Sequence, residues 1–260
     1  MSAHVGVDRL SDGAALRLAF SHEKGNVLTS ELLARVDAAL AEHAADPHLK
    51  LVLLEGVGKH FSLGASIDEH DKAHVAGMLA SFHSLVRRLA TYPVATAALV
   101  RGRCLGGALE LALSCNFVFA ARSAVFACPE ITLGVFPPVL AALGPMRIGA
   151  AWTERLALTG ADLDADTARA IGLVTEVVPD GVDVLERAVV WFEATLAKRS
   201  AFALRRTLEA VRAGSAVGER VTRTLGEIER QYLERVVPSF DGNEGIDAFL
   251  AKREPRWRDA

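Results

Sequence analysis

Hydrophobic positions in the first third of the chain form short runs of strand length that alternate with a run of helical spacing. Residues 14–20 (AALRLAF) and 49–56 (LKLVLLEG) are apolar runs typical of buried strands. Residues 28–46 lie between them, with apolar positions on one helix face and Thr29 or Ser30 as the possible N-cap. The pattern predicts strand, strand, helix and strand at the start of the chain.

The same order returns twice further along the chain. Residues 75–92 predict a helix that Pro93 stops, residues 94–100 predict a strand, and the loop at 101–107 leads into another helix. A third unit runs through 116–121 and 124–128 to 129–138. Such alternation without an exact sequence period is typical of an α/β fold made of stacked ββα-like units with parallel strand pairing.

From Val184 onward the pattern becomes almost entirely helical, with helices predicted at 184–200, 201–214, 217–237 and 243–253. Their apolar faces need a surface to pack on, either the preceding core or a neighbouring subunit. We therefore expect a core at residues 1–190, a helical C-terminal region at 191–260, and a homo-oligomer.

Composition and charge exclude several classes of protein. Apolar residues make up 51% of the chain, but charges, glycines or prolines interrupt every run before the ~18 residues of a membrane span. A formal net charge of −3 gives no general attraction to nucleic acid. The start of the chain lacks a secretion or import signal, so a cytoplasmic protein is expected. Cys104, Cys115 and Cys128 form no CxxC pair and are expected to be small buried groups rather than disulfides or zinc ligands.

Two loops share a strand, a turn of small residues and a helix start. One contains Gly64 and Ala65, and the other contains Gly106 and Gly107. Both could present backbone N–H groups, the second at the positive end of a helix, and together they could form an oxyanion hole. The alternative is that the glycines only permit tight turns.

Two glutamates lie close to these loops in the sequence. Glu110 follows Gly107 by about one helical turn, within residues that look buried, and otherwise it would simply be a carboxylate favoured near a helix start. Glu130 follows Pro129 and could be an ordinary loop residue. Together they could act as acid and base, although the spacing alone does not establish that they meet.

Other chemistry is weakly indicated. His70 and His74 have the i, i+4 spacing of metal ligands on one helix face, but no HExxH motif or third ligand accompanies them. Ser62 and Ser66 are possible nucleophiles without a GxSxG elbow. We expect no metal and no separate cofactor.

Four segments, in order, resemble the enoyl-CoA hydratase/isomerase (crotonase) superfamily. They are HFSLGASIDEH, VRGRCLGGALELALSCNFVFAA, FACPEITLGVFP and NEGIDAFLAKREPRW. The resemblance covers almost the whole chain. It implies a crotonase-like spiral of repeated ββα units, a helical C-terminal region used in trimerisation, and a homotrimer or a hexamer of two trimers.

The resemblance also implies residue roles. Ala65 and Gly107 would hold the thioester carbonyl oxygen through their N–H groups, and Glu110 and Glu130 match the two catalytic glutamates of the hydratases. Coenzyme A enters as part of the acyl-CoA substrate. The residues implied in substrate and CoA binding are Lys24, Ala65, Ser66, Ile67, Asp68, Gly107, Phe249 and Lys252.

The sequence departs from the superfamily pattern at three places, and the residues found there add bulk at the acyl end of the predicted site. Ser66 replaces the usual Asp, Ala108 replaces a Gly, and PPVLA at residues 137–141 replaces PGAGG. Within the superfamily the segments are most like cyclohexa-1,5-diene-1-carbonyl-CoA hydratases of anaerobic aromatic degradation. This implies 1,4-addition of water to give 6-hydroxycyclohex-1-ene-1-carbonyl-CoA.

Three alternatives stay open at this point. The chain could be a general enoyl-CoA hydratase or isomerase of fatty-acid oxidation, or a thioester hydrolase that uses the same oxyanion hole. It could also be a non-catalytic or RNA-binding crotonase-like protein, although both glutamates and the lack of basic charge argue against this.

Overall fold

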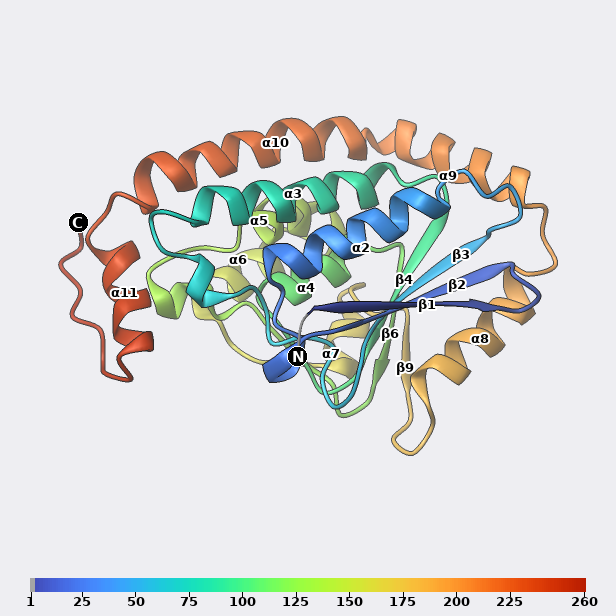
Figure 1. Cartoon of the computed structure of the whole chain (residues 1–260), viewed down its shortest axis with the longest axis horizontal. Coiled ribbons are helices and arrows are strands. Elements are labelled where there is room, and N and C mark those ends of the chain that lie inside the picture. The colour runs from blue at the N-terminus through green and yellow to red at the C-terminus, as the bar shows by residue number, and fades with distance from the viewer. Residues whose placement is uncertain (1–2) are drawn as a thin grey trace.

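The computed structural model describes residues 3–260, without the side chains of Lys24 and Arg220, and is built on two sheets flanked by helices (Figure 1). The larger sheet has the order β1-β2-β3-β4-β6-β9, with β1 antiparallel to β2 and the other pairs parallel. Its strands are β1 (His4–Leu10), β2 (Ala15–Ser21), β3 (Leu51–Gly56), β4 (Ala95–Val100), β6 (Phe117–Ala121) and β9 (Glu176–Val178). The strands predicted near residues 14–20, 49–56, 94–100 and 116–121 are thus confirmed.

The smaller sheet gives the molecule its spiral character. It has the order β5-β7-β8, formed by β5 (Arg103–Leu105), β7 (Val125–Ala127) and β8 (Leu163–Asp164). Isolated parallel bridges from Leu28 to Ala65 and from Ser62 to Cys104 continue this layer. Each turn of the chain therefore adds a strand to the large sheet, a short strand or bridge to the second layer, and a helix, which confirms the expected repeated ββα units.

Helices cover both faces of the large sheet. On one face α2 (Ser30–His43) and α3 (Val75–Thr91) pack over Leu18 and Leu54, and the Thr29 hydroxyl caps α2 by accepting from the Leu32 amide. On the other face α8 (Val184–Thr195) buries Phe192 against Leu53 and Phe119. Successive side chains of a strand point to opposite faces of the sheet, so they pack against α2 and α3 on one face and against α8 on the other.

The middle of the chain contains helices that the hydrophobic pattern did not reveal. They are α5 (Pro138–Arg147), α6 (Ala150–Thr159) and α7 (Ala165–Ala170). Helix α5 starts with a proline, where the missing N–H is harmless, but it also contains Gly144 and Pro145, which disfavour a helix on propensity. Tertiary burial of Val139, Leu140 and Leu143 outweighs that cost.

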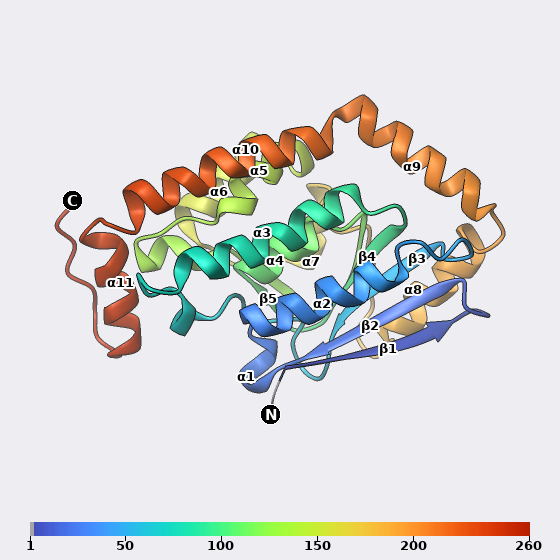
Figure 2. The ribbon, with the colours of Figure 1, turned by 45° about the horizontal axis from the view of Figure 1, so that its top comes forward.

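The C-terminal region folds back over the core of its own chain. It consists of α9 (Ala201–Ser215), α10 (Val217–Gln231), a π-helical turn η3 (Tyr232–Val236) and α11 (Asp241–Leu250). Helix α10 lies along α3, and α11 stands at the far end of the molecule from the large sheet (Figure 2). The predicted boundary between residues 190 and 191 falls within α8.

Helix α11 is seated directly on a short 3-10 helix, η2 (Pro129–Leu133). A Cβ atom on Gly245 would collide with the Leu133 backbone, and one on Gly134 would collide with the Asp241 carbonyl. The two backbones therefore approach as closely as glycine allows.

Within residues 3–260, no helix is both long enough and apolar enough to cross a membrane.

Candidate active site

The first loop places the Ala65 amide at the inner layer of the spiral. Ala65 is bridged to Leu28, but the hydrogen bonds of the bridge use the Gly64 carbonyl and the Ser66 amide. Gly64 has φ of 104°, and an added Cβ would lie 2.8 Å from the Leu105 carbonyl oxygen, so glycine is required here. The Ala65 amide has no hydrogen-bond acceptor among the described residues.

The second loop brings the start of α4 (Gly107–Leu113) beside Ala65. Gly106 is the N-cap with φ of 51°, and Gly107 is the first helical residue. A Cβ built on Gly107 would lie 3.5 Å from the Ala65 nitrogen. The Gly107 amide, like that of Ala65, has no acceptor in the described part of the chain. Two free donors side by side at a helix N-terminus can hold one oxygen atom that becomes negative.

Glu110 is buried one turn into α4, with 3% of its surface exposed. Its Oε1 accepts a hydrogen bond of 2.8 Å from the Leu140 amide, in the first turn of α5. Burial raises the pKa of Glu110 to about 7, while the Leu140 and Val139 amides oppose that rise. The N-terminus of α5 therefore stabilises the ionised form of a carboxyl group that burial would otherwise keep neutral.

Glu130 lies in η2 and faces the same entrance of α4. Its Oε1 would lie 2.5 Å from a Cβ built on Gly106. The residue is half-buried overall, but its Oε2 is closed off from solvent and has no hydrogen-bond partner among the described residues. Burial first, and then the charge of Glu110, raises the pKa of Glu130 to about 8.

The structure thus brings Ala65, Gly107, Glu110 and Glu130 to one place, which sequence spacing alone could not establish. Burial raises the pKa of both carboxyl groups, and the charge of Glu110 raises that of Glu130 further, so the pair favours holding a proton. Such a pair can accept a proton at one oxygen and deliver one at another, next to donors for an oxyanion.

The loop after Ala65 faces α11. Ser66 is buried and its carbonyl is hydrogen-bonded to His70 Nδ1 at 2.6 Å, whereas Asp68 is exposed in a single 3-10 turn, η1 (Ile67–Glu69). A surface pocket of about 330 Å³ lies between this loop and α11. Its lining residues include Ile67, Asp68, Lys72, Ile246, Asp247 and Leu250.

The other predicted binding residues are less closely associated with the site. Phe249 and Lys252 are exposed at the end of α11 and do not line this pocket. Lys24 belongs to the short helix α1 (Glu23–Asn26), and its side chain lies outside the described part of the structure. Their predicted contacts with coenzyme A stay predictions.

The histidines and serines weighed as alternatives have local partners. His74 is paired with Asp71, and Ser62 accepts a hydrogen bond from the Gly64 amide. In the described part of the chain, no group of three or more His, Cys, Asp or Glu side chains could hold a metal ion. The three cysteines are buried free thiols, as predicted.

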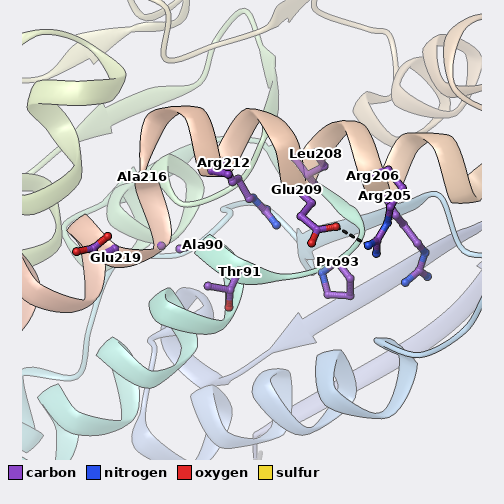
Figure 3. A pocket seen from close by; sticks show the side chains of 12 residues that line it. Ala90, Thr91, Pro93, Arg205, Arg206, Leu208, Glu209, Arg212, Ala216 and Glu219 are labelled. Carbon is purple, nitrogen blue, oxygen red and sulfur yellow. Dashed lines mark ion pairs between the residues drawn. The ribbon is translucent and has the colours of Figure 1, made fainter.

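A separate cavity of about 490 Å³ lies between the end of α3 and the junction of α9 with α10 (Figure 3). Two of the arginines that line it, Arg205 and Arg212, are half-buried. Arg205 donates to the Ala44 carbonyl at 3.0 Å and Arg212 donates to the Leu89 carbonyl at 3.1 Å. These arginines therefore satisfy the free carbonyls at the ends of α2 and α3.

The site includes one contribution that sequence analysis missed, the Leu140 amide. The available signal was the Pro137-Pro138 pair, because proline favours the first position of a helix. That signal would have placed a helix N-terminus, and hence free amides, in the segment that follows η2.

Comparison with known proteins gives a consistent result. The family model described as "Enoyl-CoA hydratase/isomerase" matches residues 16–260. The chain is 41% identical to the cyclohexa-1,5-dienecarbonyl-CoA hydratase of Thauera aromatica, over 95% of this chain and 93% of that protein. It is 35% identical to a probable enoyl-CoA hydratase of Mycobacterium bovis, over 89% of each. A crystal structure of an enoyl-CoA hydratase from Mycobacterium avium subsp. paratuberculosis superposes with a TM-score of 0.84 at 29% identity, covering 98% of both chains.

Proposed function

The chain belongs to the enoyl-CoA hydratase/isomerase family of enzymes and has the crotonase fold, and from this premise we propose that it hydrates an alicyclic dienoyl-CoA, cyclohexa-1,5-diene-1-carbonyl-CoA. The family itself implies a hydro-lyase acting on an acyl-CoA thioester. The observation that carries the proposal is the pair of carboxyl groups, Glu110 and Glu130, beside two amide donors that have no acceptor among the described residues.

The amides of Ala65 and Gly107 hold the thioester carbonyl oxygen. When water attacks the β carbon, electrons move onto this oxygen and an enolate-like anion develops. Donors that are already in place stabilise that charge without rearrangement, and losing one such donor typically costs ~2.7 to 4 kcal/mol of transition-state stabilisation.

The two carboxyl groups divide the proton transfers. Glu110, which the amides of α5 favour in its charged form, takes a proton from water as the new C–O bond forms. Glu130, which has no such donor, holds the shared proton and delivers it to the far end of the diene. The remaining double bond moves between them, so the product is 6-hydroxycyclohex-1-ene-1-carbonyl-CoA.

Two observations support the cyclic substrate over a linear one. The relative from Thauera aromatica is named for this substrate and is 41% identical over almost the whole chain. In addition, Pro137, Pro138 and Val139 are all buried around the start of α5, beside Glu110. A rigid, filled wall suits a flat ring better than an extended flexible chain.

The remaining parts of the site follow from the same proposal. The loop from Ala65 to Asp68 lines the binding site for coenzyme A, with Lys24, Phe249 and Lys252 as further contacts. Residues 191–260 form a trimerisation region, in a cytoplasmic homotrimer or hexamer. Exposed apolar side chains on α9, Phe202 and Val211, support such an assembly.

Mass spectrometry of the products from a panel of acyl-CoAs tests the function directly. The panel contains cyclohexa-1,5-diene-1-carbonyl-CoA, cyclohex-1-ene-1-carbonyl-CoA and crotonyl-CoA. We expect a gain of one water with the highest kcat/KM on the cyclic diene. Highest kcat/KM on crotonyl-CoA would instead support a general enoyl-CoA hydratase, and a shifted double bond without gain of mass would support an isomerase.

A further inference from the structure

Tyr232 is a buried residue at an unusual point of the backbone. It is the first residue of the π-helical turn η3, where α10 ends, and 2% of its surface is exposed. Single π-helical turns cost stability relative to regular helix and are often found at functional sites. Sequence analysis did not single out this residue.

The chain has two tyrosines, and both are buried. The Tyr92 hydroxyl donates a hydrogen bond of 2.8 Å to the Leu40 carbonyl. The Tyr232 hydroxyl has no hydrogen-bond partner among the described residues. The hydroxyl oxygen is not fully enclosed, unlike Oε2 of Glu130, so a water molecule can reach it and serve as its partner.

Packing places Tyr232 at the catalytic end of the molecule. Its ring meets that of Phe136 edge-on, with centroids 5.2 Å apart, and it shares a hydrophobic cluster with Ala65 and Val135. Burial raises the pKa of Tyr232, and the charges of Glu130 and then Glu110 raise that pKa further. These contacts and charges place the phenol in the same region of the molecule as both carboxyl groups.

In the same region Oε2 of Glu130 is enclosed and has no hydrogen-bond partner among the described residues. An enclosed carboxyl oxygen without a partner carries a desolvation cost, which a small polar ligand shared with the Tyr232 hydroxyl would remove. In a hydratase the reacting water is a ligand of that kind.

We propose that the Tyr232 hydroxyl donates a hydrogen bond to the water molecule that is added to the substrate, which makes Tyr232 a further catalytic residue. The inference rests on the proposed hydratase function. The two hydrogens of the water face Glu110 and Glu130, one lone pair accepts from Tyr232, and the other is aimed at the β carbon. Four contacts fix both the position and the orientation of the nucleophile.

Loss of this role lowers kcat and leaves KM almost unchanged. Water is bound independently of the thioester, so loss of its hydrogen bond slows the addition but leaves acyl-CoA binding intact. Tyr232→Phe keeps the ring and its contact with Phe136. We expect kcat to fall about tenfold on both crotonyl-CoA and the cyclic dienoyl-CoA, with KM changed less than about twofold. Tyr232→His, which retains a donor on a ring, is expected to keep more of kcat.

Tyr92→Phe is the matched control, because it removes a buried hydroxyl that has a structural partner and whose pKa neither carboxyl group affects. We expect a lower Tm and an unchanged kcat. An unchanged kcat in Tyr232→Phe would overturn the proposal. A rise in KM confined to the cyclic substrate would also overturn it, since the phenol would then contact the ring instead of water.

Calorimetry gives a second test that needs no turnover. The hydroxyl of 3-hydroxybutyryl-CoA occupies the position of the added water, whereas butyryl-CoA lacks it. We expect the wild-type protein to bind the hydroxylated thioester more tightly, and Tyr232→Phe to lose most of that preference. An equal preference in both proteins would contradict the role of Tyr232, whereas absence of hydration by the wild-type protein would contradict the proposed function itself.

Discussion

Glu110 and Glu130 are the same residue type at one site, yet their surroundings differ. Glu110 is enclosed and accepts a hydrogen bond from the Leu140 amide at the start of α5, whereas Glu130 is half-buried and its Oε2 has no partner among the described residues. Burial raises the pKa of both carboxyl groups, to about 7 and about 8 respectively. The comparison indicates that the N-terminus of α5 favours the charged form of Glu110 over that of Glu130.

Removing either carboxyl group tests whether both take part. We expect Glu110→Gln and Glu130→Gln each to lower kcat by about 10² to 10⁴, because each removes one of two proton transfers. The double variant should lose little more than the worse single variant, since the pair acts as a unit. Hydration of the cyclic dienoyl-CoA, followed by mass spectrometry, measures all three.

Glu55→Gln provides the control for these substitutions. Glu55 is a buried carboxylate paired with Arg17 and Arg101 and lies outside the site. We expect its loss to lower Tm and leave kcat unchanged. If Glu110→Gln or Glu130→Gln behaved like Glu55→Gln, the paired mechanism would be wrong.

Gly106→Ala should disturb Glu130 while leaving Glu110 in place. The new Cβ would lie 2.5 Å from Glu130 Oε1, so this carboxyl group must shift. A displacement of about 1 Å can cost about 10² in rate, and we expect a loss of about 10- to 100-fold in kcat.

Gly58→Ala is the control that distinguishes displacement of the Glu130 carboxyl group from strain in the backbone. Gly58 also has a positive φ, of 87°, but nothing lies within 4 Å of its added Cβ. Both substitutions therefore strain the backbone, and both should lower Tm. Equal loss of kcat in the two variants would show that strain, and not the position of Glu130, is responsible.

The pH profile distinguishes the two carboxyl groups by their charge. Below the lower pKa of the pair both are protonated and no base remains, and above the upper pKa both are charged and no acid remains. We expect kcat/KM to be bell-shaped, with its maximum between pH 7 and pH 8. In the residual activity of Glu110→Gln, the basic limb should move to lower pH, because the charge that raises the pKa of Glu130 is gone. A basic limb that stays in place would contradict the coupling.

The pH dependence of thermal stability is the smallest of the four predicted effects. Both folded-state pKa values lie above the ordinary value of 4.5, so protonation of the pair favours the folded state at low pH. This stabilisation is complete below about pH 4.5 and is lost as the pH rises through 8. Relative to the wild type, Glu130→Gln should therefore gain several degrees in Tm between pH 5 and pH 9, with a smaller gain for Glu110→Gln. Circular dichroism melts at each pH measure this, and a constant difference would refute it.

The sequence predicted the parts of the fold that follow from local patterning. The alternation of apolar runs identified β3, β4 and β6 together with α2 and α3, because their burial is one-sided or complete and therefore periodic. Helices α5 to α7 were missed since prolines, glycines and short length hide their pattern. The residues expected to be buried, such as Glu110 and the cysteines, are buried.

The site was predictable only in part. The sequence placed Gly107 and Glu110 on one helical turn, and the family resemblance supplied Ala65 and Glu130. The Leu140 amide had only the indirect signal of the Pro137-Pro138 pair, and Tyr232 had none, because each reaches the site through packing between segments distant in sequence. Backbone groups and side chains of this kind carry no motif, so only the three-dimensional arrangement reveals them.

The contact between α11 and η2 has a consequence for biosynthesis. Gly245 is seated against the Leu133 backbone, three residues after Glu130, although more than a hundred residues separate the two segments. A nascent chain can therefore complete both sheets, α4 and α5 while the segment that carries Glu130 still lacks its outer support. On the ribosome, the ability to catalyse should be acquired late, after most of the fold, and it should depend on the arrival of α11.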